Sequence, residues 1–330
     1  MPKTLITGAT GFLGSHLIDL LGLKRRQSLR VLVRESRPES EVEVVEGSVL
    51  DAEAVARAVD GVEQIYHLAG KVSRDPDDVR ELYRVHVEGT TTLCRAAKSA
   101  GVKRIVVAST SGTMAVTEDG ETIPDETAPP PLELIGGWPY YTSKLYQEEA
   151  AKRECEGGPE VIILNPSLLL GPGDKRLSST EDVLKFLARD IPVIPPGGVN
   201  FVDVRDVAEA FRSAMEKGRP GERYLLGGPN WSFKMFFERL ERLSKVKGPK
   251  VRLPEAMYSL AGMAVDAFYR QLDKAPPVDL VSVEMGRRFW YVDASKAERE
   301  LGFHARDPYE TLHETVAYIK TELLGASVLS

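Results

Sequence analysis

The chain has 330 residues, 42% hydrophobic and 28% charged, which is ordinary for a soluble globular protein. Its net charge of −6 offers no basic field for nucleic acid, and its two cysteines and five histidines lack metal-site spacing. No stretch reaches the ~18–20 apolar residues of a membrane span and no signal peptide is evident, so we expect a cytoplasmic protein with no metal, no membrane span and no nucleic-acid partner.

Short apolar runs alternate with amphipathic runs through the first half of the chain. Several apolar runs are continuous and β-branched, which is typical of strands covered on both faces. This alternation predicts a parallel sheet with right-handed crossovers, hence a doubly wound α/β fold. We expect strands at Thr4–Thr7, Arg30–Val33, Val42–Val45, Gln64–Leu68, Ile105–Ala108 and Val161–Leu164. We expect helices at Gly14–Leu23, Ala52–Val59, Val79–Ala100 and Thr142–Glu154.

Glycine and proline become frequent after Asn165, for example in NPSLLLGPGD and PVIPPGGVN. Frequent glycine and proline residues predict short elements joined by loops. We expect these elements to form a smaller domain that lies over the sheet. We therefore place a larger domain at residues 1–168 and a smaller one at 169–330, with 199–228 returning to complete the sheet. The apolar stretch 256–268 is interpreted as a core helix or a pocket wall.

The segment TLITGATGFLGSHLIDLL places Gly8, Gly11 and Gly14 directly after the first strand and at the start of a helix. In a Rossmann-like fold these glycines permit a tight turn, backbone approach to a pyrophosphate, and close helix–strand packing. The first domain is therefore expected to bind a dinucleotide and the second mainly the substrate. The expected loop contacts are Gly8, Thr10, Gly11, Phe12, Leu13 and Gly14.

The end of the second strand indicates which dinucleotide is bound. Asp or Glu there usually accepts a hydrogen bond from the ribose 2′-hydroxyl, but RVLVRESR has Arg34, followed by Glu35 and Arg37. A guanidinium suits a 2′-phosphate and cannot accept a hydroxyl proton. We therefore favour NADP(H), and Glu35 keeps NAD(H) as an alternative.

The next two strand ends are expected along the same cofactor. Ser48 and Val49 follow the third strand and should run under the adenine, through backbone or side-chain contacts. Leu68, Ala69 and Gly70 follow the fourth strand and should lie near the middle of the cofactor. Each pair or triplet alone is equally compatible with a simple turn.

The segment GGWPYYTSKLYQ places Lys144 four residues after Tyr140. Pro139 suits the first turn of a helix, and positions four apart share a helix face. The Lys144 ammonium would stabilise the phenolate and lower the Tyr140 pKa from its usual value of about 10, which suits an acid/base. Lys144 could also hold the nicotinamide ribose. Tyr141 and Tyr146 are interpreted as packing residues.

Together, TGATGFLG, VASTSGT, YYTSK and NPSLLLGPGD resemble the extended short-chain dehydrogenases/reductases, an epimerase/dehydratase superfamily. The order of the motifs is similar to that of the dihydroflavonol reductase-like branch. The resemblance implies that Thr110, or Ser111 if the register differs by one, binds the substrate oxygen beside Tyr140. It also implies that Pro166 and Ser167 lie beside the nicotinamide.

Two departures from the family pattern bear on function. His86 stands where many relatives have an Asn that holds the active-site helix and a water relay, and a hydrogen bond from His86 could replace it. Dehydratases carry an Asp-Glu pair directly after the catalytic Thr. Here Ser111 and Gly112 follow, which argues against dehydration.

We therefore predict an NADP(H)-dependent oxidoreductase that interconverts a carbonyl and an alcohol on a small, apolar organic substrate. One alternative is a nucleotide-sugar epimerase with tightly bound NAD, and a second is a 3-beta-hydroxysteroid dehydrogenase-like activity. A non-enzymatic cofactor-sensing protein is the third. The chain could form a homodimer. The basic residues that an epimerase would use for a substrate pyrophosphate are Lys175, Arg176, Arg287 and Arg288.

Overall fold

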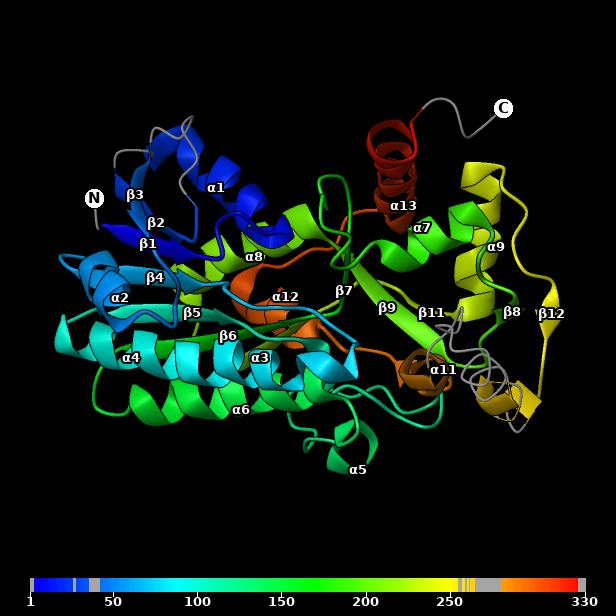
Figure 1. Cartoon of the computed structure of the whole chain (residues 1–330), viewed down its shortest axis with the longest axis horizontal. Helices are drawn as coiled ribbons and strands as arrows, with labels where there is room; N and C mark the ends of the chain where they lie inside the picture. The colour runs from blue at the N-terminus through cyan, green and yellow to red at the C-terminus, as the bar shows by residue number, and fades with distance from the viewer. Residues whose placement is uncertain are drawn as a thin grey trace.

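The structure, a computed structural model, describes residues 3–25, 28–35, 42–254, 257–258, 260, 262–264 and 280–325. Arg37 and much of the apolar stretch 256–268 lie outside the described residues. Figure 1 shows a large sheet with its helices toward the N-terminus, and a second group of short strands and helices built from the later part of the chain.

A seven-stranded sheet forms the larger part, in the order β10-β6-β5-β4-β1-β2-β3. Every neighbouring pair is parallel, which confirms the predicted doubly wound α/β fold. The strand order reverses between β1 and β4, where such sheets open a crevice at their carboxyl ends. The strands are β1 (Thr4–Thr7), β2 (Leu29–Val33), β3 (Glu43–Glu46), β4 (Gln64–His67), β5 (Arg104–Ala108), β6 (Glu160–Pro166) and β10 (Arg223–Leu226).

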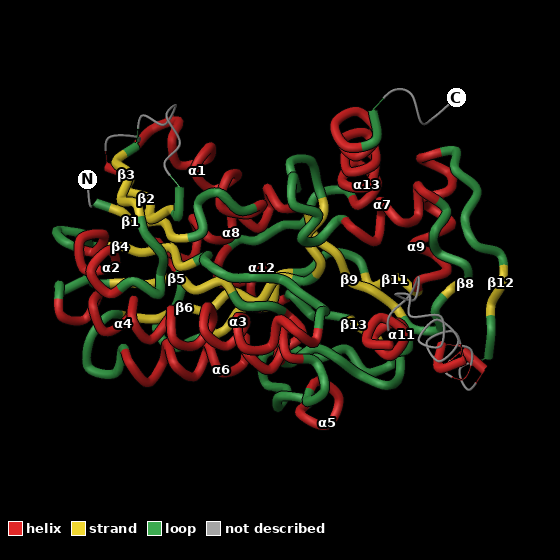
Figure 2. Tube along the Cα trace, viewed as in Figure 1, coloured by secondary structure: helices red, strands yellow, loops and turns green. Residues whose placement is uncertain are grey.

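Helices cover both faces of this sheet (Figures 1 and 2). Adjacent residues of a strand point to opposite faces of the sheet. Leu5 and Ile6 of β1 accordingly belong to two different buried clusters. The Ile6 cluster includes Phe211 of α8, and the Leu5 cluster includes Leu93 of α4. The helices of the first face are α1 (Phe12–Arg25), α8 (Val204–Lys217) and α12 (Ser295–Leu301), and those of the second are α2 (Ala52–Val59), α3 (Val79–Tyr83), α4 (Gly89–Ser99) and α6 (Pro139–Glu154).

One predicted helix is more complicated than its sequence pattern indicates. We expected a regular helix over Val79–Ala100, but a π-helical turn, η3 (Arg84–Glu88), separates α3 from α4. The backbone stays helical throughout, so the turn widens the helix rather than ending it. The buried His86 side chain lies in this turn, and π turns often mark functional positions.

The later part of the chain builds two small sheets around its own core, which includes Phe186, Phe201 and Phe236. Within the expected return segment 199–228, β10 joins the large sheet while β9 lies in the second sheet. That second sheet consists of β7 (Leu168–Leu170), β9 (Gly198–Asp203), β11 (Asn230–Ser232) and β13 (Phe289–Trp290). The other small sheet pairs β8 (Val193–Ile194) with β12 (Val251–Arg252). The helices of this later part are α7 (Glu181–Ala188), α9 (Phe233–Ser244), α11 (Leu280–Gly286), α13 (Pro308–Tyr318) and the π-helical η5 (Ile319–Leu323). Short helices elsewhere are the 3-10 helices η2 (Pro76–Asp78) and η4 (Ser111–Thr113) and the α-helix α5 (Leu132–Ile135).

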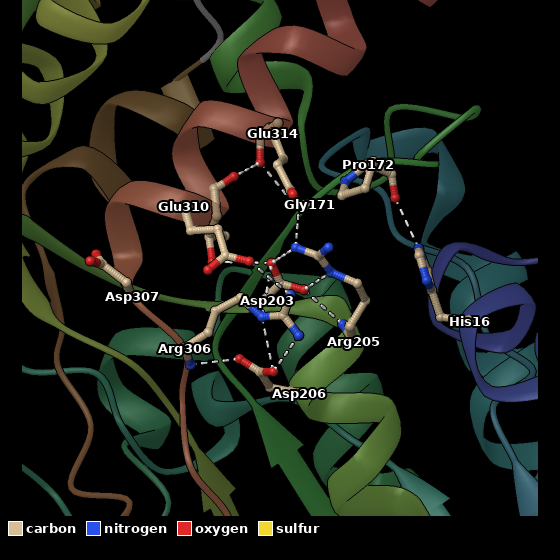
Figure 3. Close-up of polar contacts among 12 residues, drawn as sticks. His16, Gly171, Pro172, Asp203, Arg205, Asp206, Arg306, Asp307, Glu310 and Glu314 are labelled. Atoms are coloured by element: carbon tan, nitrogen blue, oxygen red, sulfur yellow. Dashed lines mark hydrogen bonds and ion pairs between the residues drawn. The ribbon is translucent and has the colours of Figure 1, made fainter. Parts of the chain in front are cut away.

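Ion pairs hold α13 against the start of α8 (Figure 3). The buried Asp203 carboxylate caps α8, pairs with Arg205 at 2.8 Å and accepts from the Thr311 hydroxyl of α13 at 3.1 Å. Arg205 also pairs with Glu314 of α13.

The loop at 171–173 links this network to the first helix. Its Gly171 N–H donates to the Thr315 hydroxyl of α13 at 2.8 Å, and the Pro172 carbonyl lies 2.9 Å from His16 Nε2 of α1 (Figure 3). The later part of the chain is thereby fixed to the helix that follows the glycine loop.

Candidate active site

The glycine loop joins β1 to α1 at the crevice. Gly8 has a φ of +71°, and a Cβ there would approach the Leu68 carbonyl group to 2.5 Å. A Cβ at Gly14 would overlap the Gly8 carbonyl oxygen, so α1 can meet β1 this closely only through glycine. A Cβ at Gly11 would meet the Gly8 oxygen at 3.2 Å and otherwise open space. The loop therefore fits a dinucleotide, whose pyrophosphate needs that room.

The ends of β2 and β3 lie beside this loop. Arg34 and Glu35 directly follow β2, and both side chains are exposed. Ser48 Oγ accepts a hydrogen bond from the Leu50 N–H at 3.3 Å. The Val49 side chain is buried and packs on Gly89 of α4, so the expected contact with an adenine would have to come from its backbone.

The turn after β4 is held from beneath by buried polar contacts. His67 Nδ1 lies 2.8 Å from the Thr7 hydroxyl, and His67 Nε2 lies 2.8 Å from the Thr90 hydroxyl. The Ala69 N–H donates to the same Thr7 oxygen at 3.2 Å. Burial, with a smaller effect of Lys144, lowers the His67 pKa to about 3, so the imidazole is neutral. These contacts hold the 68–70 turn against the glycine loop.

Helix α6 begins at Pro139, as its sequence predicts, and carries Tyr140 in its first turn. The Thr110 side chain, just beyond the end of β5, lies near enough to the Tyr140 phenol to act on its pKa. Ser111, the alternative to Thr110, is buried in the following turn. The structure therefore brings Thr110 to Tyr140.

Lys144 lies one turn further along α6 and is buried. Its ammonium donates to the Ala108 carbonyl at 2.8 Å and to Gln147 Oε1 at 2.9 Å. Burial lowers the Lys144 pKa to about 8, and the negative charge of Glu148 opposes this shift. Lys144 is therefore mainly protonated at neutral pH.

The predicted lowering of the Tyr140 pKa is wrong for this structure. Burial, together with the nearby Tyr141, raises the Tyr140 pKa, and the Thr110 side chain opposes that rise. The Lys144 ammonium is directed at Ala108 and Gln147 instead, and it is absent from the groups that shift Tyr140. The Tyr140 phenol is therefore protonated in the free protein.

The other two tyrosines differ in their surroundings. The Tyr141 ring lies 5.0 Å from that of Trp290 and also packs on Gly112, as expected for a packing residue. Trp290 stacks in turn on Trp138 at 5.5 Å. Tyr146, also interpreted as packing, is 47% exposed, and its ring lies 6.0 Å from that of Tyr83, so it packs at the surface rather than in the core.

His86 makes two buried hydrogen bonds that fix its tautomer. Nε2 accepts from the Lys71 N–H at 3.1 Å, so the ring proton lies on Nδ1, which donates to the Ser143 hydroxyl at 2.8 Å. That hydroxyl then donates to the Tyr140 carbonyl at 2.9 Å. His86 thus holds the first turn of α6, a role that its sequence position suggests.

Pro166 ends β6, and Ser167 follows it at the same edge of the sheet. The Ser167 N–H donates to the Leu226 carbonyl at 2.9 Å. Its hydroxyl is buried without a hydrogen-bond partner among the described residues. Such an unpaired group fits a cofactor that brings its own polar atoms to this point.

Sequence reasoning missed an ion pair that bridges the two parts of the chain. Arg74, in the loop after β4, donates to both carboxylate oxygens of Asp182 in α7, at 3.2 and 2.9 Å. Burial raises the Tyr141 pKa to about 12, and the charges of Arg74 and Asp182 shift that pKa in opposite directions. No local pattern marks either residue, because they are far apart in sequence.

The basic residues considered for a nucleotide-sugar pyrophosphate are not gathered into one site by their contacts. Arg287 pairs with Glu284 at 3.3 Å, and Arg288 pairs with Glu118. Lys175 and Arg176 are exposed in the loop after β7. Among the described residues, no cluster of His, Cys, Asp and Glu could hold a metal ion. Within that same part of the chain, no helix has the length and apolar character needed to cross a membrane.

Comparisons with known proteins agree with this architecture. Residues 4–227 match the model of the NAD dependent epimerase/dehydratase family. A protein of Synechocystis sp. named "Putative dihydroflavonol 4-reductase" is 31% identical over 96% of this chain and 96% of its own. Sterol demethylase protein B of Methylococcus capsulatus is 30% identical over 96% of this chain and 98% of its own. The crystal structure of gox2253 has a TM-score of 0.82 and 29% identity, and the match covers 97% of this chain and 98% of that one.

Proposed function

Because this chain belongs to the NAD dependent epimerase/dehydratase family, we propose that it is an NADP(H)-dependent oxidoreductase that interconverts a carbonyl and an alcohol on an apolar organic molecule. The observation that carries the proposal is the contact between Thr110 and Tyr140, with Lys144 one turn along the same helix. All three side chains lie at the carboxyl edge of the sheet, where such folds bind their ligands.

Each residue has one role in the proposed reaction. When bound, the nicotinamide supplies the hydride for reduction or accepts it for oxidation. Thr110 donates a hydrogen bond to the substrate oxygen, and Tyr140 gives that oxygen its proton. The raised Tyr140 pKa favours this protonated form. Lys144, whose ammonium contacts Ala108 and Gln147 rather than the phenol, is proposed to hold the nicotinamide ribose.

The cofactor is proposed to be held along the crevice, and Arg34 favours the phosphorylated form. Arg34 is exposed directly after β2, where its guanidinium can meet a 2′-phosphate. The open space at Gly11 supports the proposed position of the pyrophosphate, and the unpaired Ser167 hydroxyl supports that of the nicotinamide. The contacts proposed are Gly8, Thr10, Gly11, Phe12, Leu13, Gly14, Arg34, Ser48, Val49, Leu68, Ala69, Gly70, Tyr140, Lys144, Pro166 and Ser167.

The substrate is proposed to be bulky and apolar. The two full-length relatives carry names that refer to a dihydroflavonol and a sterol, both polycyclic molecules. Tyr141 lies 5.0 Å from Tyr140 and joins a cluster with Trp138 and Trp290, which offers an aromatic surface beside the proton donor. A steroid dehydrogenase-like activity is a special case of this proposal, and the pairing of Arg287 and Arg288 with carboxylates counts against an epimerase.

We also propose that residues 1–168 form the cofactor domain and residues 169–330 the substrate domain. The proposed location is the cytoplasm, and the chain could form a homodimer.

The test of function is a spectrophotometric assay of the purified chain with NADPH and with NADH. The substrates are a dihydroflavonol, a 3-ketosteroid, cinnamoyl-CoA and an aromatic aldehyde. We expect substrate-dependent NADPH oxidation with at least one of them. Tightly bound NAD without net cofactor turnover, and conversion of a nucleotide sugar, would replace the proposal with the epimerase alternative.

A further inference from the structure

Helix α6 carries a buried carboxylate one turn after Lys144. Glu148 is 2% exposed, and its Oε1 atom accepts hydrogen bonds from Asn165 Nδ2 at 2.7 Å, from the Thr113 hydroxyl at 2.9 Å and from the Ser109 hydroxyl. Three donors directed at one oxygen are what an ionised carboxylate, which only accepts, requires when buried. The proposed reaction gives Glu148 no role.

The donors to Glu148 are the residues that shape the loop around Thr110. Ser109 precedes Thr110, and the Thr113 hydroxyl lies 3.0 Å from the Thr110 carbonyl. Asn165 Nδ2 also lies 3.1 Å from that carbonyl. Glu148 therefore joins this loop to the helix that carries Tyr140 and Lys144.

Glu148, four residues after Lys144 on α6, also acts on it as a negative charge. Among the described groups that act on the Lys144 pKa, burial lowers it and Glu148 raises it. The other titratable groups facing Lys144 are His67 from β4 and His86 from η3, and burial lowers the pKa of both, so they stay neutral.

Two further cations face the carboxylate itself. The Arg223 guanidinium of β10 lies 3.6 Å from Glu148 Oε2. Lys152 lies one turn further along α6, and the Glu148 charge acts to raise its pKa. Glu148 is thus set among cations while its Oε1 atom is directed at the Thr110 loop.

We propose that Glu148 is a positioning residue that fixes Thr110 relative to Tyr140 and supplies the counter-charge of the Lys144 ammonium. The inference rests on the proposed function, in which Thr110, Tyr140 and Lys144 are the catalytic residues. A residue that only filled space would leave the titration of Lys144 unchanged when its charge alone is removed.

The first test measures Lys144 directly and needs no substrate. Lysine side chains of the full chain are labelled with ¹³C at Cε and titrated by NMR, and the Lys144 resonance is assigned by its loss in Lys144→Met. In Glu148→Gln we expect the titration midpoint to fall by at least ~0.5 pH unit. The control is Glu149→Gln, the same change at the exposed neighbouring residue, which should leave the midpoint in place. An unchanged midpoint in Glu148→Gln would overturn the counter-charge role.

The second test separates charge from position. Glu148→Asp keeps the charge but withdraws the carboxylate from the Thr110 loop. We expect it to keep the Lys144 midpoint within ~0.3 pH unit while kcat for the best substrate falls about 10- to 100-fold, because small displacements of catalytic groups slow reactions by such factors. NADPH affinity should stay within about 2-fold. Unchanged kcat in Glu148→Asp would overturn the positioning role, and this variant keeps that role testable if Glu148→Gln does not fold.

Tyr140→Phe, measured in parallel, tells the two proposals apart. If Tyr140→Phe turns over normally, the proposed function fails. If Tyr140→Phe is inactive while both Glu148 variants behave like the wild type in titration and turnover, only the role of Glu148 fails.

Discussion

The His86 Nδ1 atom lies 2.8 Å from the Ser143 hydroxyl, and this contact joins a π-helical turn to the start of the helix that carries Tyr140. Because the Lys71 N–H occupies Nε2, the ring must donate from Nδ1, and Ser143 then donates to the Tyr140 carbonyl. An imidazole thus performs by hydrogen bonding the helix-holding role that the family pattern gives to an amide.

Replacing His86 tests this role. In His86→Leu the Lys71 N–H and the Ser143 hydroxyl lose their buried partner, so we expect the free energy of unfolding to fall by about 1–3 kcal/mol. Turnover should fall as well, because the first turn of α6 is released. His86→Asn keeps a hydrogen-bond donor and an acceptor, so it should recover part of the stability and part of the turnover. Urea denaturation and kcat measure the effects, and a fully active His86→Leu would contradict the assigned role.

The neutral His67 predicts acid sensitivity of the fold. The folded pKa is about 3 and the ordinary value is 6.5, so below pH 6.5 the unfolded chain binds a proton that the folded protein does not. Stability therefore falls as the pH drops from about 6.5 toward 3, by about 2 kcal/mol at pH 5 for this group.

Urea denaturation at pH 7.5 and pH 5 checks this prediction. His67→Gln should lose less stability between the two pH values than the wild type does. His304→Gln, a change at an exposed histidine, is the control and should match the wild type. Equal losses in all three proteins would show that His67 already titrates normally in the folded state.

Gly14→Ala should damage cofactor binding through packing alone. The added Cβ overlaps the Gly8 carbonyl oxygen, so α1 must move away from the loop that receives the pyrophosphate. We expect NADPH affinity to fall at least ~10-fold, since each 1.4 kcal/mol of lost binding is tenfold. Gly137→Ala, where the structure shows open space, is the matched control. Isothermal titration calorimetry measures both, and equal affinities would contradict the close approach.

Arg34 should determine the choice between cofactors. A hydrogen-bonded charge pair with a 2′-phosphate is worth about 1.5–3 kcal/mol, so Arg34→Ala should lower kcat/KM for NADPH by roughly 10- to 150-fold. The value for NADH should change little. Glu35→Ala, at the exposed neighbour, should leave the preference for NADPH intact or increase it. A wild type that prefers NADH would refute the assignment of Arg34.

Local patterns predict the parts of the site that depend on near neighbours in the chain. Gly8, Gly11 and Gly14 mark the loop because their roles follow from their order after a strand. Tyr140 and Lys144 are recognisable because one helical turn separates them. The interruption at His86 was not predicted, since helical periodicity does not distinguish a π turn from a regular one.

Contacts between distant segments could not be inferred in the same way. The Arg74–Asp182 bridge joins residues 108 positions apart. Asn165 was noted only as a boundary, yet its amide contacts both Glu148 and the Thr110 carbonyl. The Tyr140 pKa was predicted in the wrong direction, because helix geometry places Lys144 on the same side but leaves open which carbonyl or amide its ammonium contacts.

The most direct test of the proposed mechanism is the kcat/KM of Tyr140→Phe, measured with NADPH and the best carbonyl substrate and accompanied by the NADPH dissociation constant. Loss of the proton donor should lower kcat/KM by about 10²- to 10⁴-fold. The dissociation constant should stay within about 2-fold, because the phenol oxygen is the single group removed and the packing of the ring on His86 and Tyr141 is retained. Full activity in Tyr140→Phe would contradict the account, since the substrate oxygen would then be receiving its proton from another group.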